Sequence, residues 1–146
     1  MIKLATMNAD ACNKTETIEV PAKAENLARL RHFVKDFASL CGFSSADVYD
    51  IVLAVGEAIS NAVEHGSPGG EKSAIVVTCG CHDDDLVVQV SDEGVFQRQM
   101  PELETEPDAS YRGRGIFLML ALMDKVSIDE SKKGTTVFLS KRFFTA

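Results

Sequence analysis

Residues Ser44–Gly66 read SSADVYDIVLAVGEAISNAVEHG, and the rest of the chain is best interpreted outward from this stretch. Ser44 and Asp47 make a capping-box-like start, and Gly66 and Pro68 follow the last periodic residue, so we expect a helix from about Ser45 to His65. At about 100° per residue, one face of this helix is apolar. That face contains Ile51, Val52, Val55, Ile59, Ala62 and Val63.

Nearly the opposite face carries a row of polar side chains. Glu57, Asn61 and His65 are spaced by four, which lines up a carboxylate, an amide and an imidazole. A solvated polar face is the ordinary interpretation of such a row, because any amphipathic helix shows one. The row by itself therefore does not establish a functional site.

The segments on either side predict the remaining elements. Leucine, valine and phenylalanine recur at helical spacing from Leu27 to Leu40, with Gly42 as the end of that helix, and the later part of the chain alternates between β-rich runs and turns. The expected order is a strand (15–20), the two helices, a hairpin (74–81 and 86–91, turn 82–85), a third helix (113–123) and two strands (125–129 and 135–142). This order favours an α+β two-layer sandwich whose antiparallel or mixed, mostly antiparallel, sheet carries its helices on one face.

Length and charge set further bounds. A chain of 146 residues and 15.8 kDa fits one domain spanning 1–146, and a glutamate- and proline-containing segment at about 95–112 is interpreted as an acidic lid. A net charge of −7 and a pI near 4.9 argue against direct binding of nucleic acid or an anionic membrane. No apolar run approaches the roughly 18 residues of a membrane span, so we expect a cytoplasmic protein.

The four cysteines are expected to be thiols in a reducing compartment. Cys12, Cys41, Cys79 and Cys81 show no disulfide framework. A zinc site at Cys79-Gly80-Cys81-His82 is disfavoured, because C-x-C is tighter than the usual knuckle and no second cluster follows.

Two glycine-bearing motifs stand beside regular elements. In Ser91-Asp92-Glu93-Gly94 a strand ends in a carboxylate followed two residues later by a glycine, an arrangement suited to binding an exocyclic amine. In Arg112-Gly113-Arg114-Gly115-Ile116 a helix start offers free N–H groups and two arginines to phosphate. Neither a Walker A motif nor a Rossmann fingerprint is present, so a nucleotide site would be of another kind.

Five segments, taken in order, resemble the boxes of the GHKL ATPase/kinase superfamily, and within it the bacterial anti-sigma-factor serine kinases of the RsbW type. The resemblance runs from about Ile18 to Lys141 and implies the Bergerat α/β sandwich, with ATP and Mg²⁺ held between the helices and a lid. The segments are 53–66, 91–94, 113–116, 123–126 and 134–137.

The resemblance also implies roles for individual residues. Glu57 would be the general base that takes a proton from the attacking hydroxyl, and Asn61 would ligate Mg²⁺ through its side-chain oxygen. Asp92 would accept from the adenine amine. Gly94 would shape the adenine pocket, Gly113 and Gly115 would let the lid close on the phosphates, and Thr135 belongs to the last box. Arg112 and Arg114 would contact the γ-phosphate or an acidic partner. His65 would either contact the nucleotide or cap the helix.

One position departs from the family pattern. The second glycine of the adenine box is replaced by Phe96, which either packs on the base or narrows the pocket. The affinity for ATP is therefore the property that this departure affects.

The implied function is a serine/threonine kinase that phosphorylates a small STAS-like anti-sigma antagonist and sequesters a sigma factor. A homodimer is also implied, with the strand at 15–20 and the helix at 27–40 as its candidate surface. Two alternatives remain at this point: a non-catalytic ATP/ADP-binding module whose nucleotide state sets partner affinity, and a structural domain whose polar helix face is only solvated.

Overall fold

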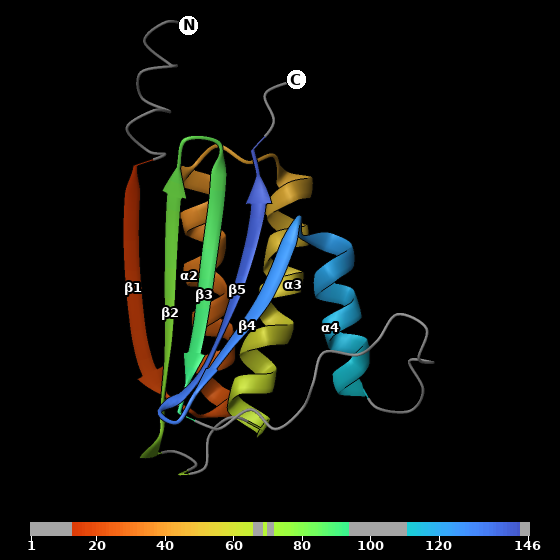
Figure 1. The fold of residues 1–146 in the computed structure, drawn as a ribbon. Helices are drawn as coiled ribbons and strands as arrows, with labels where there is room; N and C mark the ends of the chain where they lie inside the picture. Colours follow the sequence, from red (N-terminus) through yellow and green to blue (C-terminus); the bar gives the residue numbers. More distant parts are fainter. Residues whose placement is uncertain (1–12, 66–68, 70–71, 94–110, 144–146) are drawn as a thin grey trace, which may run out of the picture.

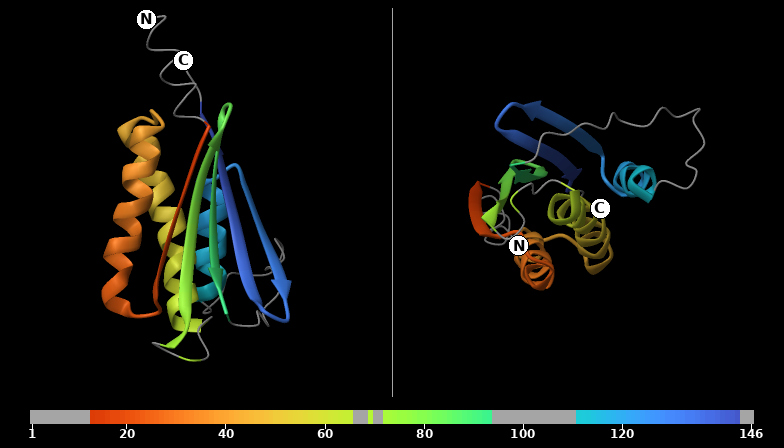
Figure 2. Two further views of the ribbon diagram at one scale, coloured as in Figure 1. Left: turned by 90° about the vertical axis from the view of Figure 1, so that its left-hand side faces the viewer. Right: turned by 90° about the horizontal axis from the view of Figure 1, so that it is seen from below.

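The protein folds into two layers, a β-sheet covered on one face by helices (Figures 1 and 2). The computed structural model describes residues 13–65, 69, 72–93 and 111–143. Its elements are β1 (Lys14–Pro21), the short 3-10 helix η1 (Ala24–Asn26), α2 (Leu27–Leu40), α3 (Ser45–His65), β2 (Ala74–His82), β3 (Asp85–Asp92), α4 (Tyr111–Leu122), β4 (Lys125–Ser131) and β5 (Gly134–Arg142).

The sheet has five strands in the order β1-β2-β3-β5-β4. All of its pairings among the described strands are antiparallel, so the parallel component that a mixed sheet would contain is not found there. The predicted α+β two-layer sandwich is confirmed. Each strand runs slightly beyond its predicted bounds, which shortens the β2–β3 and β4–β5 turns to two residues each, at positions 83–84 and 132–133.

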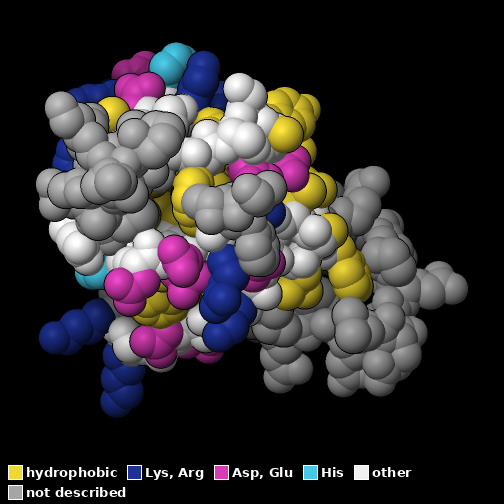
Figure 3. Space-filling view, turned by 90° about the horizontal axis from the view of Figure 1, so that it is seen from above, with side chains coloured by type: hydrophobic (Ala, Val, Ile, Leu, Met, Phe, Trp, Pro, Cys, Tyr) yellow, Lys and Arg dark blue, Asp and Glu magenta, His cyan; other side chains and the backbone are white. Residues whose placement is uncertain are grey.

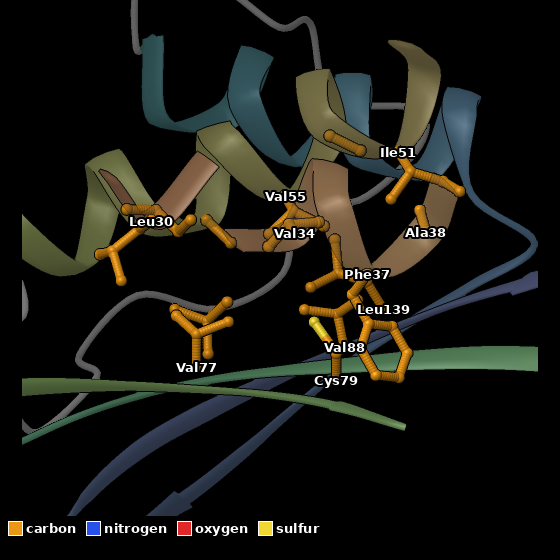
Figure 4. Packing of buried hydrophobic residues seen from close by; sticks show 14 of the residues in the cluster. Leu30, Val34, Phe37, Ala38, Ile51, Val55, Val77, Cys79, Val88 and Leu139 are labelled. Atoms are coloured by element: carbon orange, nitrogen blue, oxygen red, sulfur yellow. The ribbon is translucent and has the colours of Figure 1, made fainter. Parts of the chain in front are cut away.

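Alternate residues of the strands enter the core. One row across the sheet contains a β-branched side chain from every strand, and all five pack on the helix-covered face. Such residues favour a pleated, half-buried surface of this kind. The row is Ile18, Val77, Val90, Val137 and Ile128. Figure 4 shows Val77, Cys79 and Val88 of the sheet packed beneath Leu30, Val34 and Phe37 of α2 and Val55 of α3.

The end of α2 and the start of α3 follow the predicted chemistry. Gly42 takes a φ of +98°, a left-handed conformation that ends α2 without the penalty a side chain would incur. The Asp47 amide donates to Ser44 Oγ at 3.1 Å, which confirms Ser44 as the N-cap of α3. Gly66 and Pro68, the predicted end signals of α3, lie outside the described residues.

Leu40 lies outside the core although it continues the apolar spacing of α2. It is 63% exposed, whereas Cys41 is 2% exposed. At 100° per residue, Leu40 points about 80° away from the direction of Leu30, while Cys41 points within about 20° of it. Cys41 therefore takes the core-facing position at the end of the helix.

The cysteine prediction holds for the described part of the chain. Cys41, Cys79 and Cys81 are buried thiols, and Cys12 lies outside the described residues. Burial raises the pKa of the Cys79 thiol to about 12, with smaller contributions from Cys41 and Glu16. His82 is exposed and lies on the Gly80 face of β2, opposite the two buried sulfurs, so these residues do not converge on a zinc ion.

Residues 94–110, which contain most of the predicted acidic lid, are outside the described residues. Within the described residues, no helix is long and apolar enough to cross a membrane.

Figure 3 views the end of the molecule that carries the β2–β3 turn, where acidic and basic side chains lie next to one another. There Asp83 and Asp84 are exposed and Arg142 Nε lies 3.6 Å from Asp85 Oδ1, so this end presents a solvated, charged surface.

Candidate functional site

Four chain segments with candidate site residues meet at the other end of the sandwich. The end of α3, the end of β3, the start of β5 and the start of α4 all lie at the same end (Figure 1). Their alternating directions produce this arrangement, because α3 and β3 run toward this end whereas α4 and β5 run away from it. Segments that are distant in sequence thus contribute to one surface.

The first group of residues lies between α3 and α4. Gly115 of α4 is buried, and a Cβ built on it would lie 2.8 Å from Glu57 Oε1 and 3.7 Å from Asn61 Nδ2. The Glu57 and Asn61 side chains are half-buried. The polar row on α3 is therefore packed against a second helix, and a purely solvated face does not describe it.

The second group lies where β3 pairs with β5. Asp92 is directly opposite Thr135 in the antiparallel register; Asp92 is half-buried and Thr135 is only 3% exposed. One position earlier, Ser91 Oγ and Thr136 Oγ1 are 2.9 Å apart in a hydrogen bond. These contacts bring together Asp92 and Thr135, which the sequence places in separate motifs.

Gly134 allows this strand pairing to close. Its φ of +152° is strained for a residue with a side chain, and a Cβ there would collide with the Asp92 carbonyl oxygen and lie 3.1 Å from Glu93 Cα. The Glu93 side chain is held against the start of β2, because its Oε2 accepts a hydrogen bond from the Ala74 amide at 3.3 Å. The sequence interpretation gave Gly134 and Glu93 no site role; a glycine at the start of a strand was the available signal for the first.

The start of α4 differs from the prediction. The helix begins at Tyr111, two residues before the predicted start, so Gly113 is its third residue and not its first. Gly115 is its fifth residue, beyond the four N–H groups that a helix N-terminus leaves free. The Gly115 amide is therefore not one of the free donors expected to bind phosphate.

Several candidate residues are located only by their backbone or not at all. His65 is the last residue of α3, and Arg112, Gly113 and Arg114 lie in the first turn of α4. Nothing is described for the side chains of His65, Arg112 and Arg114. Gly94 and Phe96 lie outside the described residues.

The donor set next to Gly115 fits a hard divalent cation. The Glu57 carboxylate and the Asn61 amide both offer oxygen, the ligand atom that Mg²⁺ prefers. Magnesium at phosphate-transfer sites is typically held by one or two protein oxygens together with water and phosphate, so a dense cluster of protein ligands is not required. Among the described residues, no group of three or more His, Cys, Asp or Glu residues gathers as a metal site.

Comparison with known proteins adds a family match. Residues 20–141 match the family model described as a histidine kinase-like ATPase domain. The anti-sigma F factor of Clostridium acetobutylicum is 33% identical over 138 residues, covering 90% of this chain and 94% of the relative. The serine-protein kinase RsbW of Listeria innocua is 34% identical, covering 86% and 85% of the two chains.

Solved structures show the same fold. The structure of the RsbU and RsbW domains of a Mycobacterium tuberculosis protein aligns with a TM-score of 0.63 at 23% identity, covering 92% of this chain and 35% of that one. At that identity the match supports the fold alone.

Proposed function

The chain belongs to the histidine kinase-like ATPase family, and from this premise we propose that it is an ATP-dependent serine/threonine protein kinase of the anti-sigma-factor type. Relatives named serine-protein kinase RsbW and anti-sigma F factor align over most of both chains. The observation that carries the proposal is the packing of Gly115 against Glu57 and Asn61, which supports a functional role for the α3 polar row.

In the proposed reaction, Glu57 is the general base. The acceptor hydroxyl oxygen attacks the γ-phosphorus, the bond from that phosphorus to its bridging oxygen breaks, ADP leaves and Glu57 takes the hydroxyl proton. Asn61, one helical turn further along α3, would hold Mg²⁺ through its side-chain oxygen. When bound, Mg²⁺ would neutralise charge on the phosphates.

The nucleotide base is assigned to the β3–β5 end. Asp92 would accept from the adenine amine, and the buried Thr135, which lies opposite it in the register, would line the same site. The other ATP-site residues rest on the family resemblance: His65, Gly94, Arg112, Gly113, Arg114 and Gly115.

The proposed partners are a sigma factor and a STAS-like antagonist whose serine or threonine accepts the phosphate. We extend the proposal to a homodimer in the cytoplasm. β1 supports the homodimer, because it forms an edge of the sheet, and an edge strand offers backbone groups to a neighbouring chain. Leu40, which is 63% exposed at the end of α2, adds apolar surface on the helix that follows this strand.

Calorimetric titration with ATP, with and without Mg²⁺, tests the nucleotide site. Asn61→Ala should abolish the gain in ATP affinity that Mg²⁺ gives. Asp92→Asn should weaken ATP binding both with and without Mg²⁺. Asp85→Asn is the matched control for Asp92→Asn, because Asp85 lies at the opposite end of the same strand. Absence of binding at millimolar ATP would reject the proposed site.

The catalytic assignment needs a separate assay. Co-purification from the native cell and mass spectrometry would supply the antagonist, and transfer of labelled phosphate to it would then be measured. Glu57→Ala should abolish transfer while ATP binding is retained, whereas Glu64→Ala, exposed on the same helix, should transfer normally. Wild-type protein that binds ATP and the antagonist tightly without transferring phosphate would favour a nucleotide-controlled binding module.

A further inference from the structure

The clearest unexplained feature of the site is a glycine inside a helix. Glycine is the least favourable residue of a helix interior apart from proline, and Gly115 lies in the second turn of α4. Its amide is not among the free donors of the helix start, so phosphate binding by that amide does not account for the glycine.

The neighbours of Gly115 supply a different explanation. The position that a Cβ would occupy lies 2.8 Å from Glu57 Oε1, about 0.6 Å closer than ordinary van der Waals contact. The same position is 3.7 Å from Asn61 Nδ2, an ordinary contact. A side chain at residue 115 would thus displace the carboxylate and leave the amide where it is.

We propose that Gly115 is a positioning residue for the general base: its missing side chain leaves the space between α3 and α4 that the Glu57 carboxylate occupies. This inference rests on the proposed function and assigns Gly115 a role different from closing a lid on the phosphates. A general base must remain within hydrogen-bond reach of the proton it takes, and a misplacement of about 1 Å can cost about 100-fold in rate.

Gly115→Ala is the direct test. The kcat for phosphate transfer to the antagonist should fall about 10- to 100-fold, while the Kd for Mg²⁺·ATP stays within about twofold of the wild-type value. Gly56→Ala is the matched control, because Gly56 is also a buried helical glycine but its Cβ would meet only the flexible Arg31 side chain, with Cδ at 3.4 Å and Cγ at 3.9 Å. Its kcat should stay close to that of the wild type.

A stability measurement tests the contact without any partner. In a Glu57→Ala background no carboxylate opposes the added methyl, so Gly115→Ala should raise the Tm by about 2–4 °C through helix propensity. In the wild-type background, Gly115→Ala should raise the Tm by less than this or should lower it. The effect of Gly56→Ala should be the same in both backgrounds.

The outcomes are distinguishable. Equal Tm shifts from Gly115→Ala in the two backgrounds would show that the methyl does not meet Glu57 and would overturn the inference. Weakened ATP binding with an unchanged kcat at saturating ATP would overturn it in favour of a phosphate-contacting role. A wild-type protein that never transfers phosphate would instead reject the proposed function, and with it the catalytic part of the inference, while the Tm coupling still reports on the contact.

Discussion

Replacing Gly134 with alanine should be among the most damaging single-methyl changes in the protein, because two separate effects combine there. Its φ of +152° is strained for an L-residue, and the added Cβ would collide with the backbone carbonyl of Asp92. A backbone atom at the end of a paired strand cannot swing aside as a long side chain does. The collision therefore has to be relieved by moving the β4–β5 turn away from β3.

Two other glycines separate these effects. Gly42 has a φ of +98°, but a Cβ there would lie 3.6 Å from the Phe143 ring, so Gly42→Ala introduces strain without a collision. Gly80 lies in β2 and has no positive φ, and a Cβ added to it would lie 3.5 Å from Thr15 Oγ1. Gly80→Ala therefore introduces neither backbone strain nor a collision. The three substitutions add the same methyl group.

The expected magnitudes follow from the separate costs. Gly80→Ala should change the free energy of unfolding by less than about 1 kcal/mol. Gly42→Ala should lower it by about 1–2 kcal/mol, the cost of left-handed backbone for a residue with a Cβ. Gly134→Ala adds about 1–3 kcal/mol of overpacking, for a total near 3 kcal/mol, or roughly 6–12 °C in Tm.

Urea denaturation followed by circular dichroism measures all three variants, since a small folded chain of this size is expected to unfold in one step. ATP titration of the same proteins should show weaker binding for Gly134→Ala than for Gly42→Ala, because only the former displaces the backbone of Asp92. If Gly134→Ala is no more destabilising than Gly42→Ala, the close approach of β5 to Asp92 is not a real constraint and this reasoning is refuted.

Two further predictions concern stability and the buried thiols. Ser44→Ala should lower the free energy of unfolding by about 1 kcal/mol, because the Asp47 amide loses the Ser44 hydroxyl as its hydrogen-bond acceptor. Urea denaturation measures this change, and a neutral effect would contradict the capping role. Cys79, with its pKa raised to about 12 from 9.0, should resist alkylation at pH 8 until the protein unfolds. Between about pH 9 and 12 the unfolded thiol loses its proton before the folded one, so wild-type stability should fall relative to that of Cys79→Ala.

Local signals predicted the individual elements well. The cap at Ser44, the left-handed Gly42 and the alternating runs around the β2–β3 turn act over a few residues, and each was found where the sequence placed it. The same local reasoning started α4 two residues late. At the end of α2 the 100° period itself favours Cys41 over Leu40 for the core-facing position, because Cys41 points close to the direction of Leu30 and Leu40 does not.

The candidate site was predictable in its residue types but not in its contacts. The polar row on α3 and the carboxylate at the end of β3 were visible as patterns, whereas the roles of Gly134 and Glu93 were not. The sequence suggested that Gly115 served phosphate, because two glycines next to arginines at a helix start favour that interpretation. The position of Gly115 against Glu57 depends instead on the rotation of α4 about its own axis.

By itself, the sequence determined the helices, the strands, the α+β class and the family resemblance, since periodicity, caps and turn residues act between near neighbours along the chain. Tertiary structure alone decided that Gly115 meets Glu57 and Asn61 and that Gly134 closes on Asp92. The physical reason is that these contacts join segments far apart in sequence. Their distances depend on how each helix rotates and slides as it packs on the sheet, which no local pattern records.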